Sequence, residues 1–317
     1  MPPCSAPWQR WQQRLARRWQ HQFDRRIERA AWPQWCLLVG RSDDPDRVAP
    51  APERLRPILP PADRFWADPF GCWQDGQLHV FCEEYLRGTR HGRISLLVLD
   101  ADLQLRGPAR PVLVEDRHLS YPFLFRWDGQ LYMVPETARS GCIDLYRCTA
   151  FPLHWERQYS LLTGLEAADA TLFEHGGRWW LFCAIRDQRG HINESLHAFH
   201  ADAPISRQWT PHAANPIVRD FARGRPGGRI FRDPAGRLLR PGQDCVPRYG
   251  HGLGLYSIDT LTPWQYRERR VWQVRASGPW RALHHLDCQG DWLIMDAQRL
   301  LTTATAAGAA PATTAVE

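Results

Sequence analysis

RWDGQLYMV, residues 126–134, places an Asp-Gly pair between two runs in which apolar and polar residues alternate. Both central residues of a tight hairpin turn need positive φ, which Asp-Gly and Gly-Gly pairs tolerate well. The stretch therefore predicts a β-hairpin. Short hairpins with a turn glycine recur four times, as WQDGQLHVF (73–81), EHGGRWWLF (174–182), DPAGRLLRP (233–241) and CQGDWLIM (288–295).

These hairpins are regularly spaced along the chain. Their turn glycines lie 53, 48, 59 and 54 residues apart, at Gly76, Gly129, Gly177, Gly236 and Gly290. Another alternating run follows each of the first four hairpins, and most of these runs are followed by a segment containing Trp. Four strands in a unit of about 50 residues, repeated five times, predict an all-β fold, a five-bladed β-propeller. Trp35–Val39 is the one strand-like run before the first hairpin, and we expect it to close the ring by joining the last blade.

The overall composition sets limits on the class of protein. The chain has 317 residues, of which 44% are hydrophobic and 23% charged, as in a soluble globular protein. Its longest apolar runs are far shorter than the roughly 20 residues that cross a bilayer, and no secretory signal is visible. We therefore expect a cytoplasmic protein. The chain has no lysine, which excludes Schiff-base chemistry and the Gly-Lys-Ser/Thr phosphate loop.

The metal-ligating and thiol residues do not predict a metal site. None of the nine cysteines forms a Cys-x-x-Cys pair, so free, buried thiols are expected in place of a zinc site or disulfide framework. His284 and His285 have no metal-ligand spacing to another His or Cys. The sequence therefore predicts no metal and no cofactor.

Residues 1–33 differ from the rest of the chain. Apolar residues recur there every three or four positions, as on one face of an amphipathic helix: Trp8, Trp11, Leu15, Trp19, Phe23 and Ile27. The segment holds seven arginines on its other face against two acids, a net charge of +5 out of +6 for the whole chain. One interpretation is a helix packed on its own domain with its arginines in water. The other is a helix on an anionic membrane surface, or on a synthase partner.

The remaining regions complete the predicted organisation. Residues 34–300 form the propeller, and residues 301–317, which are low in complexity, are expected to be a disordered tail. Because the charge outside the N-terminal segment is close to neutral, nucleic-acid binding is not expected.

Equivalent positions in different blades meet around the axis of a propeller, so the five hairpins can be compared by register. Counting eight residues back from each turn glycine gives Asp68, Tyr121, Asp169, Gly228 and Ala282. Counting seven forward gives Glu83, Glu136, Ala184, Gln243 and Ala297, with Glu84 and Asp244 directly after two of them. Because neighbours on a strand point to opposite faces, only one of Glu83 and Glu84 can face the axis. The register predicts a ring of carboxyl groups, which suits chemistry at a glycosidic bond.

Several runs resemble those of one known family. They are FWADPF (65–70), HLSYPF (118–123), YMVPE (132–136) and RPGQDC (240–245) with Tyr249-Gly250. The family is the propeller domain at the N-terminus of plant glucosamine inositolphosphorylceramide transferases, and the resemblance covers about residues 34–300. More distantly, the chain is similar to the five-bladed propellers of glycoside hydrolase families 43 and 32. The plant proteins carry a separate C-terminal glycosyltransferase domain, and the sequence ends before such a domain, so the resemblance does not imply transferase activity here.

The resemblance to family 43 implies that Asp68 is the general base. The sequence departs from that family at two positions, because the second-blade Asp is replaced by Ser120-Tyr121 and the third-blade acid Glu is Asp169. Glu136, on a neighbouring strand, could replace the missing acid.

Two functional hypotheses follow. In the first, the protein binds a sugar or glycolipid in an axial cleft and acts on a glycosidic bond, with Asp68 as base or nucleophile, Glu136 as general acid and Asp169 orienting the substrate or adjusting the acid's pKa. The substrate would be bound by Glu83, Glu84, His118, Tyr121, Arg240, Gln243 and Asp244, with Arg240 alternatively paired to Asp244. In the second, the propeller is a non-catalytic glycan-recognition or scaffold module for cell-envelope polysaccharide or glycolipid biosynthesis.

Overall fold

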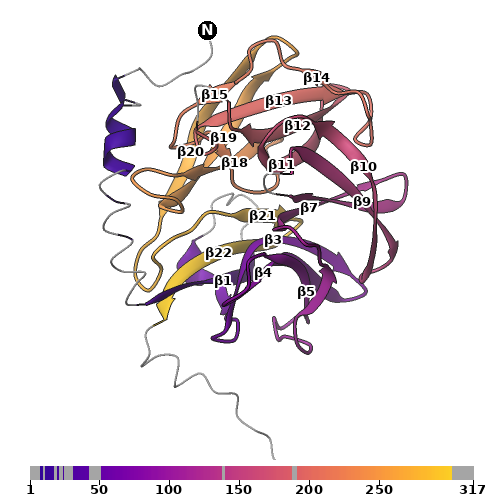
Figure 1. Ribbon diagram of the computed structural model, residues 1–317, viewed down its shortest axis with the longest axis vertical. Helices are drawn as coiled ribbons and strands as arrows, with labels where there is room; N and C mark the ends of the chain where they lie inside the picture. The colour runs from indigo at the N-terminus through magenta and orange to yellow at the C-terminus, as the bar shows by residue number, and fades with distance from the viewer. Residues whose placement is uncertain are drawn as a thin grey trace, which may run out of the picture.

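The computed structural model describes residues 8–9, 11–17, 20, 24, 31–42, 51–137, 140–187 and 191–301. Five antiparallel sheets surround a common centre, and the inner strands of neighbouring sheets contact one another there (Figure 1). The fold is a five-bladed β-propeller, as the repeated hairpins predict. Among the described residues, no helix is long and apolar enough to cross a bilayer.

Each blade is a meander of strands. Blade 1 consists of β3 (Arg64–Gln74), β4 (Gln77–Leu86), β5 (Arg93–Leu99) and β6 (Arg110–Leu113). Blade 2 consists of β7 (Ser120–Trp127), β8 (Gln130–Glu136), β9 (Cys142–Ala150) and β10 (His154–Thr163). Blade 3 consists of β11 (Ala167–His175), β12 (Arg178–Ile185), β13 (Ser195–Ala201), β14 (Thr210–Pro211) and β15 (Val218–Arg219).

The last two blades are less regular. Blade 4 has a divided inner strand, β16 (Arg225–Pro226) and β17 (Phe231–Arg232), followed by β18 (Leu238–Asp244), β19 (Gly252–Leu261) and β20 (Tyr266–Arg275). Blade 5 combines the two ends of the propeller: β21 (Leu286–Gln289) and β22 (Trp292–Leu301) pair with β1 (Trp32–Arg41) and β2 (Arg56–Ile58). A short 3₁₀ helix, η1 (Pro52–Arg54), precedes β2.

The ring is closed by pairing between β1 and β22. The two strands are antiparallel over ten residue pairs, from Trp32 opposite Leu301 to Arg41 opposite Trp292. This confirms the prediction that the strand containing Trp35–Val39 joins the last blade. The strand is longer than predicted and begins at Trp32, inside the segment 1–33 that the sequence assigns to the helix.

Three blades share a β-bulge at the same place on the inner strand. The register shifts between Ala67 and Phe70, between Ser120 and Phe123, and between Ala168 and Thr171. The first residue inside each bulge has positive φ: Asp68, Tyr121 and Asp169, with φ of 51, 44 and 56°. A non-glycine residue in this region is strained, and such strain concentrates at functional sites. In the first three blades, the residue eight positions before the turn glycine thus lies in a bulge of the inner strand.

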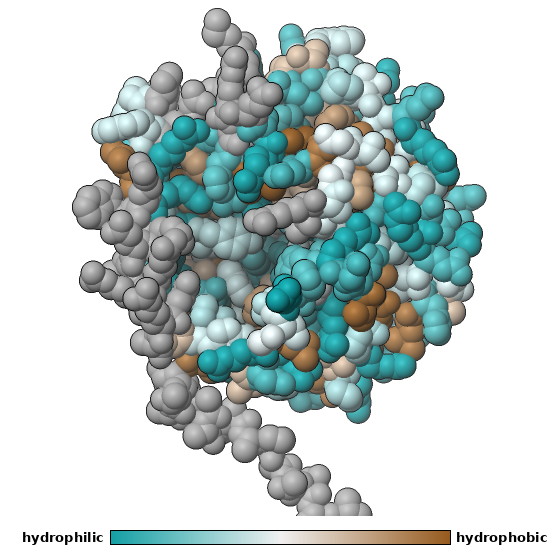
Figure 2. Space-filling model, viewed as in Figure 1, coloured by the Kyte–Doolittle hydropathy of each residue, from teal (hydrophilic) through white to brown (hydrophobic). Residues whose placement is uncertain are grey.

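Apolar side chains fill the space within and between the blades. The largest cluster joins blades 1, 2 and 3 and includes Phe70, Phe81, Tyr121 and Phe123, all almost completely buried. The eight cysteines that the structure describes are free thiols, and six of them are buried, as expected from their spacing. On the face seen in Figure 2 the surface is mainly hydrophilic, with small and separate hydrophobic areas.

The N-terminal segment is helical at the positions that the structure describes, residues 8–9, 11–17, 20 and 24. The helix lies beside blade 4, at the left margin of Figure 1. Leu15 is partly buried, whereas Trp8 and Trp11 are 60% and 63% exposed. The remaining apolar positions of the predicted stripe (Trp19, Phe23 and Ile27) and the predicted tail after Leu301 lie outside the described residues.

Candidate active site

The bulges and the neighbouring strands bring four carboxyl groups to the centre of the propeller. Asp68 and Asp169 come from the bulges of β3 and β11, Glu83 from β4 and Glu136 from the end of β8. Asp68, Glu83 and Asp169 are 6%, 7% and 1% exposed, and the side chain of Glu136 is 11% exposed. Glu83 lies close enough to Asp68, Glu136 and Asp169 for their charges to raise its pKa, and Asp68 and Asp169 raise the pKa of Glu136 in the same way, so the four groups form one cluster.

Arg225 joins two members of this cluster. Its Nε lies 2.7 Å from Asp169 Oδ2, its Nη2 lies 3.2 Å from Asp169 Oδ1, and the same Nη2 lies 3.4 Å from Glu136 Oε2. Nη1 donates to Asn193 Oδ1 at 2.9 Å. The guanidinium therefore fixes Asp169 by a two-point contact and holds Glu136 beside it. The centre of the Tyr249 ring lies 5.2 Å from the guanidinium carbon. Tyr249 is 38% exposed, so the cluster lies next to a residue at the surface.

A second charged group meets Asp68 from blade 5. His284 Nδ1 lies 2.7 Å from Asp296 Oδ2, and His284 Nε2 lies 3.8 Å from Asp68 Oδ1. The backbone N–H of Asp68 donates to Asp296 Oδ2 at 3.0 Å, which helps to hold the bulge. Although burial lowers the pKa of His284, the carboxylates of Asp296 and Asp68 raise it, which favours the imidazolium.

Asp68, His284 and Asp296 also form a group that could hold a metal ion. One ligand atom from each lies within 4.8 Å of the others, and all three residues are buried. A metal there would have to replace the 2.7 Å contact between His284 and Asp296. The sequence gives no spacing signal for this group, because the three residues come from two blades.

Burial changes the protonation of the cluster. It raises the pKa of Asp68 to about 7, an effect that His284 reduces and the carboxylate of Asp169 increases. Burial also raises the pKa of Glu83 and Glu136 well above their usual range, with further increases from Asp68 and Asp169 respectively. The Arg225 guanidinium opposes the increase at Glu136. The site thus places two acids with a strongly raised pKa beside an Asp that Arg225 binds at two points, the arrangement that general acid chemistry needs.

His118 contacts the cluster from the loop before β7. Its Nδ1 accepts a hydrogen bond from the Gly92 N–H at 2.9 Å, so its Nε2 carries the proton and lies 3.3 Å from Glu83 Oε1. The side chain is 31% exposed. Burial, and then the nearby His91, lower the pKa of His118, which keeps the ring neutral. His118 thus forms part of the rim of the site.

Tyr121 and Gln243 lie in the same region, but their polar groups form hydrogen bonds within the protein. The Tyr121 hydroxyl contacts Thr171 Oγ1 at 2.8 Å and accepts a hydrogen bond from the Gly228 N–H at 3.0 Å. Gln243 donates to Asp169 Oδ2 at 3.0 Å and to the Pro226 carbonyl at 2.8 Å. Gln243 therefore holds Asp169 in place, and Tyr121 links its own bulge to Thr171 in blade 3 and Gly228 in blade 4.

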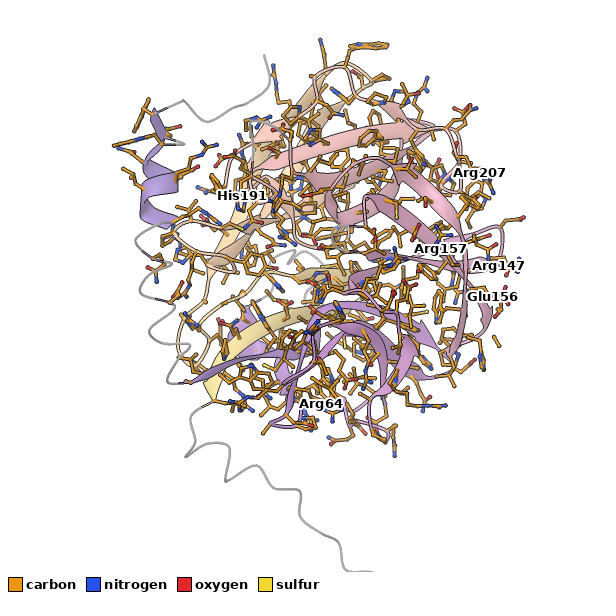
Figure 3. The ribbon with its side chains drawn as sticks, viewed as in Figure 1. Arg64, Arg147, Glu156, Arg157, His191 and Arg207 are labelled. Carbon is orange, nitrogen blue, oxygen red and sulfur yellow. The ribbon has the colours of Figure 1, made fainter. Side chains whose placement is uncertain are left out.

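Three predicted binding residues lie away from the axis. Glu84 accepts hydrogen bonds from Arg64, Arg93, Ser95 and Trp66, and Figure 3 shows Arg64 near the outer margin of the molecule. Arg240 is fully buried and makes a two-point ion pair with Glu268, not with Asp244. Asp244 accepts from the Val246 N–H and from Gln273. These side chains are engaged in contacts within their own blades.

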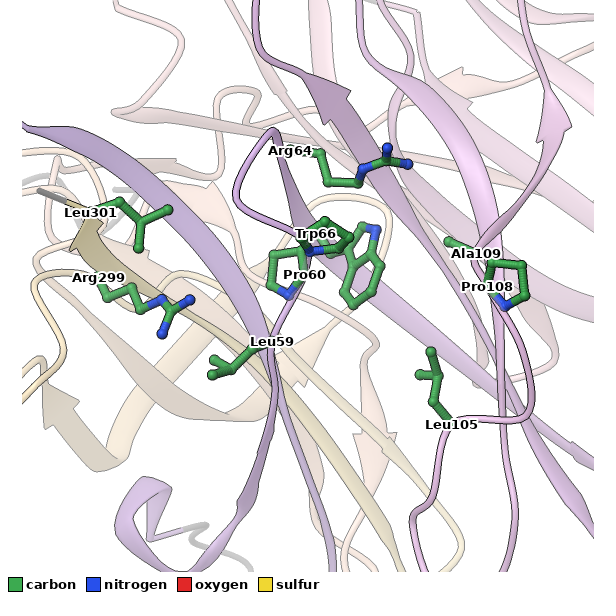
Figure 4. A pocket seen from close by; sticks show the side chains of 10 residues that line it. Leu59, Pro60, Arg64, Trp66, Leu105, Pro108, Ala109, Arg299 and Leu301 are labelled. Atoms are coloured by element: carbon green, nitrogen blue, oxygen red, sulfur yellow. The ribbon is translucent and has the colours of Figure 1, made fainter. Parts of the chain in front are cut away.

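A peripheral pocket lies between blades 5 and 1 (Figure 4). Its volume is about 820 Å³, and its lining is mostly apolar, with Leu59, Trp66 and Leu105 among the side chains. The two arginines that line it are already bonded, Arg64 to Glu84 and Arg299 to Gln34. The pocket includes none of the carboxyl groups of the axial cluster.

Register counting missed three residues of the site. In blade 5 the turn glycine, Gly290, occupies the first turn position, whereas Gly76 in blade 1 occupies the second. Counting from Gly290 therefore gave Ala297, whose side chain points to the opposite face of the strand from that of its neighbour Asp296. Arg225 lies on the two-residue strand β16, outside any hairpin pattern. His284 precedes β21 and is brought to Asp68 only by closure of the ring.

Sequence comparisons relate the chain to one family. The family model described as "Glucosamine inositolphosphorylceramide transferase 1, N-terminal" matches residues 60–291. The rice (Oryza sativa subsp. japonica) glucosamine inositolphosphorylceramide transferase 1 is 34% identical over 286 residues, which cover 83% of this chain and 38% of that protein. The Arabidopsis thaliana protein of the same name is 33% identical over 233 residues, 70% of this chain and 30% of that protein. The chain thus spans well under half the length of these curated relatives.

Solved structures agree on the fold. The catalytic domain of a GH62 α-L-arabinofuranosidase from Coprinopsis cinerea has a TM-score of 0.56 at 12% identity, over 84% of this chain and 96% of that one. A glycosyl hydrolase from Bacteroides ovatus has a TM-score of 0.54 at 11% identity, over 84% and 91% of the two chains. Identities this low concern the fold alone. The sequence match over residues 60–291 is the stronger finding, and by it the chain belongs to the glucosamine inositolphosphorylceramide transferase 1 N-terminal family.

Proposed function

We propose that this propeller binds a sugar or glycolipid at the axial cluster and acts on a glycosidic bond. The observation that carries the proposal is the pairing of Glu136, whose pKa is raised well above its usual range, with Asp169, which Arg225 holds by two contacts. Two neighbouring carboxyl groups, one with a raised pKa and the other held by an arginine, are the arrangement that glycoside-cleaving sites use. The names of the family and of the structural relatives, all carbohydrate-active proteins, favour the same substrate class.

The proposed roles follow from position and protonation. Glu136, partly exposed at the end of β8, donates its proton to the oxygen of the leaving group. Asp68, with a pKa of about 7, takes a proton from water or attacks the anomeric carbon. Asp169 and Arg225 orient the substrate and stabilise charge beside Glu136. His118 and Tyr249 lie at the partly exposed rim, where they would contact the sugar.

The experiment is a binding and turnover screen of the full chain against glycosides, glycolipids and sugar nucleotides, with product analysis of every ligand that binds. We expect turnover to be lost in Glu136→Gln and Asp68→Asn while binding persists. Glu156→Gln is the matched control, because Glu156 is 63% exposed on blade 2 and Figure 3 shows it at the outer edge of the molecule. Equal turnover in all variants would contradict the proposal.

A second candidate is a non-catalytic glycan-recognition module of envelope polysaccharide or glycolipid biosynthesis. One observation favours it: the second-blade bulge carries Tyr121, whose hydroxyl is already bonded to Thr171 and Gly228, in place of a carboxylate. Binding by the wild type and both variants, with no product from any ligand, would support this function. For either function we propose a cytoplasmic location, which cell fractionation tests.

A further inference from the structure

The N-terminal helix rests on the propeller through its polar face. Gln13 donates to Asp220 at 3.0 Å, Arg14 pairs with the buried carboxylate of Glu194 at 3.0 Å, and Arg17 donates to the Cys245 carbonyl at 2.6 Å. The guanidinium of Arg17 also lies 4.5 Å from the centre of the Phe221 ring. Arg17 lies one turn after Gln13 and Arg14, so the three contacts together fix which side of the helix faces the protein.

Two apolar side chains of the helix, Trp8 and Trp11, face water. Trp8 and Trp11 are three positions apart, hence on one side of the helix, and they are 60% and 63% exposed. Two large indole rings exposed side by side are unusual on a soluble surface. A helix that simply packed on its own domain would bury this side. The helix contacts its own domain, as in the packed-helix interpretation, but it does so through Gln13, Arg14 and Arg17.

The charge of the segment indicates what covers this side. Residues 1–33 carry +5 by sequence, and the other 284 residues together carry +1. Arg14 and Arg17 of this segment contact the propeller. Arginine beside exposed tryptophan complements an anionic lipid surface, where indoles enter the headgroup region and guanidinium groups meet phosphates.

We propose that the N-terminal helix docks the protein on the surface of an anionic bilayer, with Trp8 and Trp11 inserted among the headgroups. This inference is independent of the reaction at the axial cluster. The helix is also close to that cluster. Arg17 donates to the carbonyl of Cys245, and Cys245 lies two residues after Gln243, whose side chain contacts Asp169. Docking would therefore hold the axial site close to the membrane surface.

The test is sedimentation of the full chain with vesicles of phosphatidylcholine alone and of phosphatidylcholine mixed with phosphatidylglycerol. We expect binding to the mixed vesicles, little binding to the neutral ones, and weakening by added salt. The double variant Trp8→Ala/Trp11→Ala should bind at least about tenfold more weakly. The matched control is Trp264→Ala, because Trp264 is 67% exposed on the propeller, and it should bind like the wild type.

Three outcomes would overturn the inference. They are no binding to the anionic vesicles, binding that the double variant retains, and equal loss in the Trp264→Ala control. Light scattering after gel filtration tests whether the two tryptophans bind a second copy of the chain in place of a membrane. A dimer that the double variant abolishes would show that they do. Thermal unfolding of each variant checks that the propeller is intact, which is expected because both tryptophans are exposed.

Discussion

Glu83, Glu136 and Asp68 differ from surface acids because their surroundings, more than their residue type, decide their protonation. All three come from different strands and become neighbours at the axis, where burial and mutual repulsion disfavour the charged form. Arg225 and His284 supply the compensating positive charge. The behaviour of the site with pH is therefore a direct test of the geometry.

The rate of glycosidic cleavage should depend on pH in a bell shape. Asp68 acts as base only when ionised, so kcat/KM should rise through about pH 7. Glu136 acts as acid only when protonated, so the rate should fall at higher pH, where its raised pKa is passed. Glu136→Gln should lower the rate by about 10² to 10⁴ and remove the alkaline limb. A rate that stays constant from about pH 6 to about pH 8 would contradict these roles.

Glu83 should make the folded protein less stable as pH rises. Its pKa is raised in the folded state, so between its ordinary pKa and the raised one the folded state holds a proton that the unfolded state has lost. The free energy of unfolding then falls by about 1.4 kcal/mol per pH unit for this group. Glu83→Gln should remove that contribution, as measured by urea unfolding at several pH values. Glu156→Gln, an exposed control, should retain the wild-type slope.

Sequence reasoning could place some of these residues but not their partners. Asp68 and Asp169 were found because a repeated turn glycine and a repeated bulge keep a constant separation. Asp296 was missed because one turn has its glycine shifted by one position, which changes the face of every later residue. The contacts of Arg240 with Glu268 depend on the packing of neighbouring strands, which no local spacing shows.

At the scale of elements, the inner strands of the first four blades share one equivalent position, eight residues before the turn glycine. It holds Asp68, Tyr121 and Asp169 with positive φ in three blades, and Gly228, with φ of 131°, in the fourth. Gly228 approaches β21 so closely that a Cβ would lie 1.8 Å from the Leu286 carbonyl oxygen. The glycine is required there both by its conformation and by the lack of space.

Gly228→Ala should therefore destabilise the propeller strongly, by more than about 3 kcal/mol, and disturb the hydrogen bond to Tyr121. Gly236→Ala is the matched control. Gly236 also has positive φ, 78°, but a Cβ there would meet nothing within 4 Å, so the cost should be about 1 kcal/mol. Urea unfolding measures both, and equal costs would show that backbone conformation alone governs the two sites.

The N-terminal helix shows a different limit of prediction at this scale. Its periodicity predicted a helix and identified Trp8 and Trp11 as one face. The side that meets the propeller is decided by Asp220, Glu194 and the Cys245 carbonyl, which are about 180 to 230 residues away in sequence. Amphipathic patterning indicates two faces and does not say which face a folded domain will bind.

The whole molecule depends on one junction, the pairing of β1 with β22. The regular hairpin spacing was enough to predict five blades, because each repeat is a complete local unit. The closing pair was also predictable, since an unpaired strand at each end of the ring would leave two sheet edges exposed. The irregular inner strand of blade 4, which carries Arg225, was not predictable, because β16 and β17 are only two residues long.

Two N-terminal truncations should separate the helix from the ring. A chain lacking residues 1–30 keeps β1, so it should fold and unfold cooperatively, though without the contacts of Arg14 and Arg17. A chain lacking residues 1–41 loses the ten-residue partner of β22 and should lose cooperative unfolding and near-ultraviolet circular dichroism. Cooperative unfolding of the shorter chain would show that the ring does not need this junction.

The direction of the closing strands has a mechanical consequence. Because Trp32 lies opposite Leu301, the chain enters and leaves the propeller at the same end of one strand pair. Tension applied between the two ends would load the hydrogen bonds of this pair one after another, as in a zipper, and not all at once as in shear. The propeller should therefore open at blade 5 under a small force, while the other four blades are still intact.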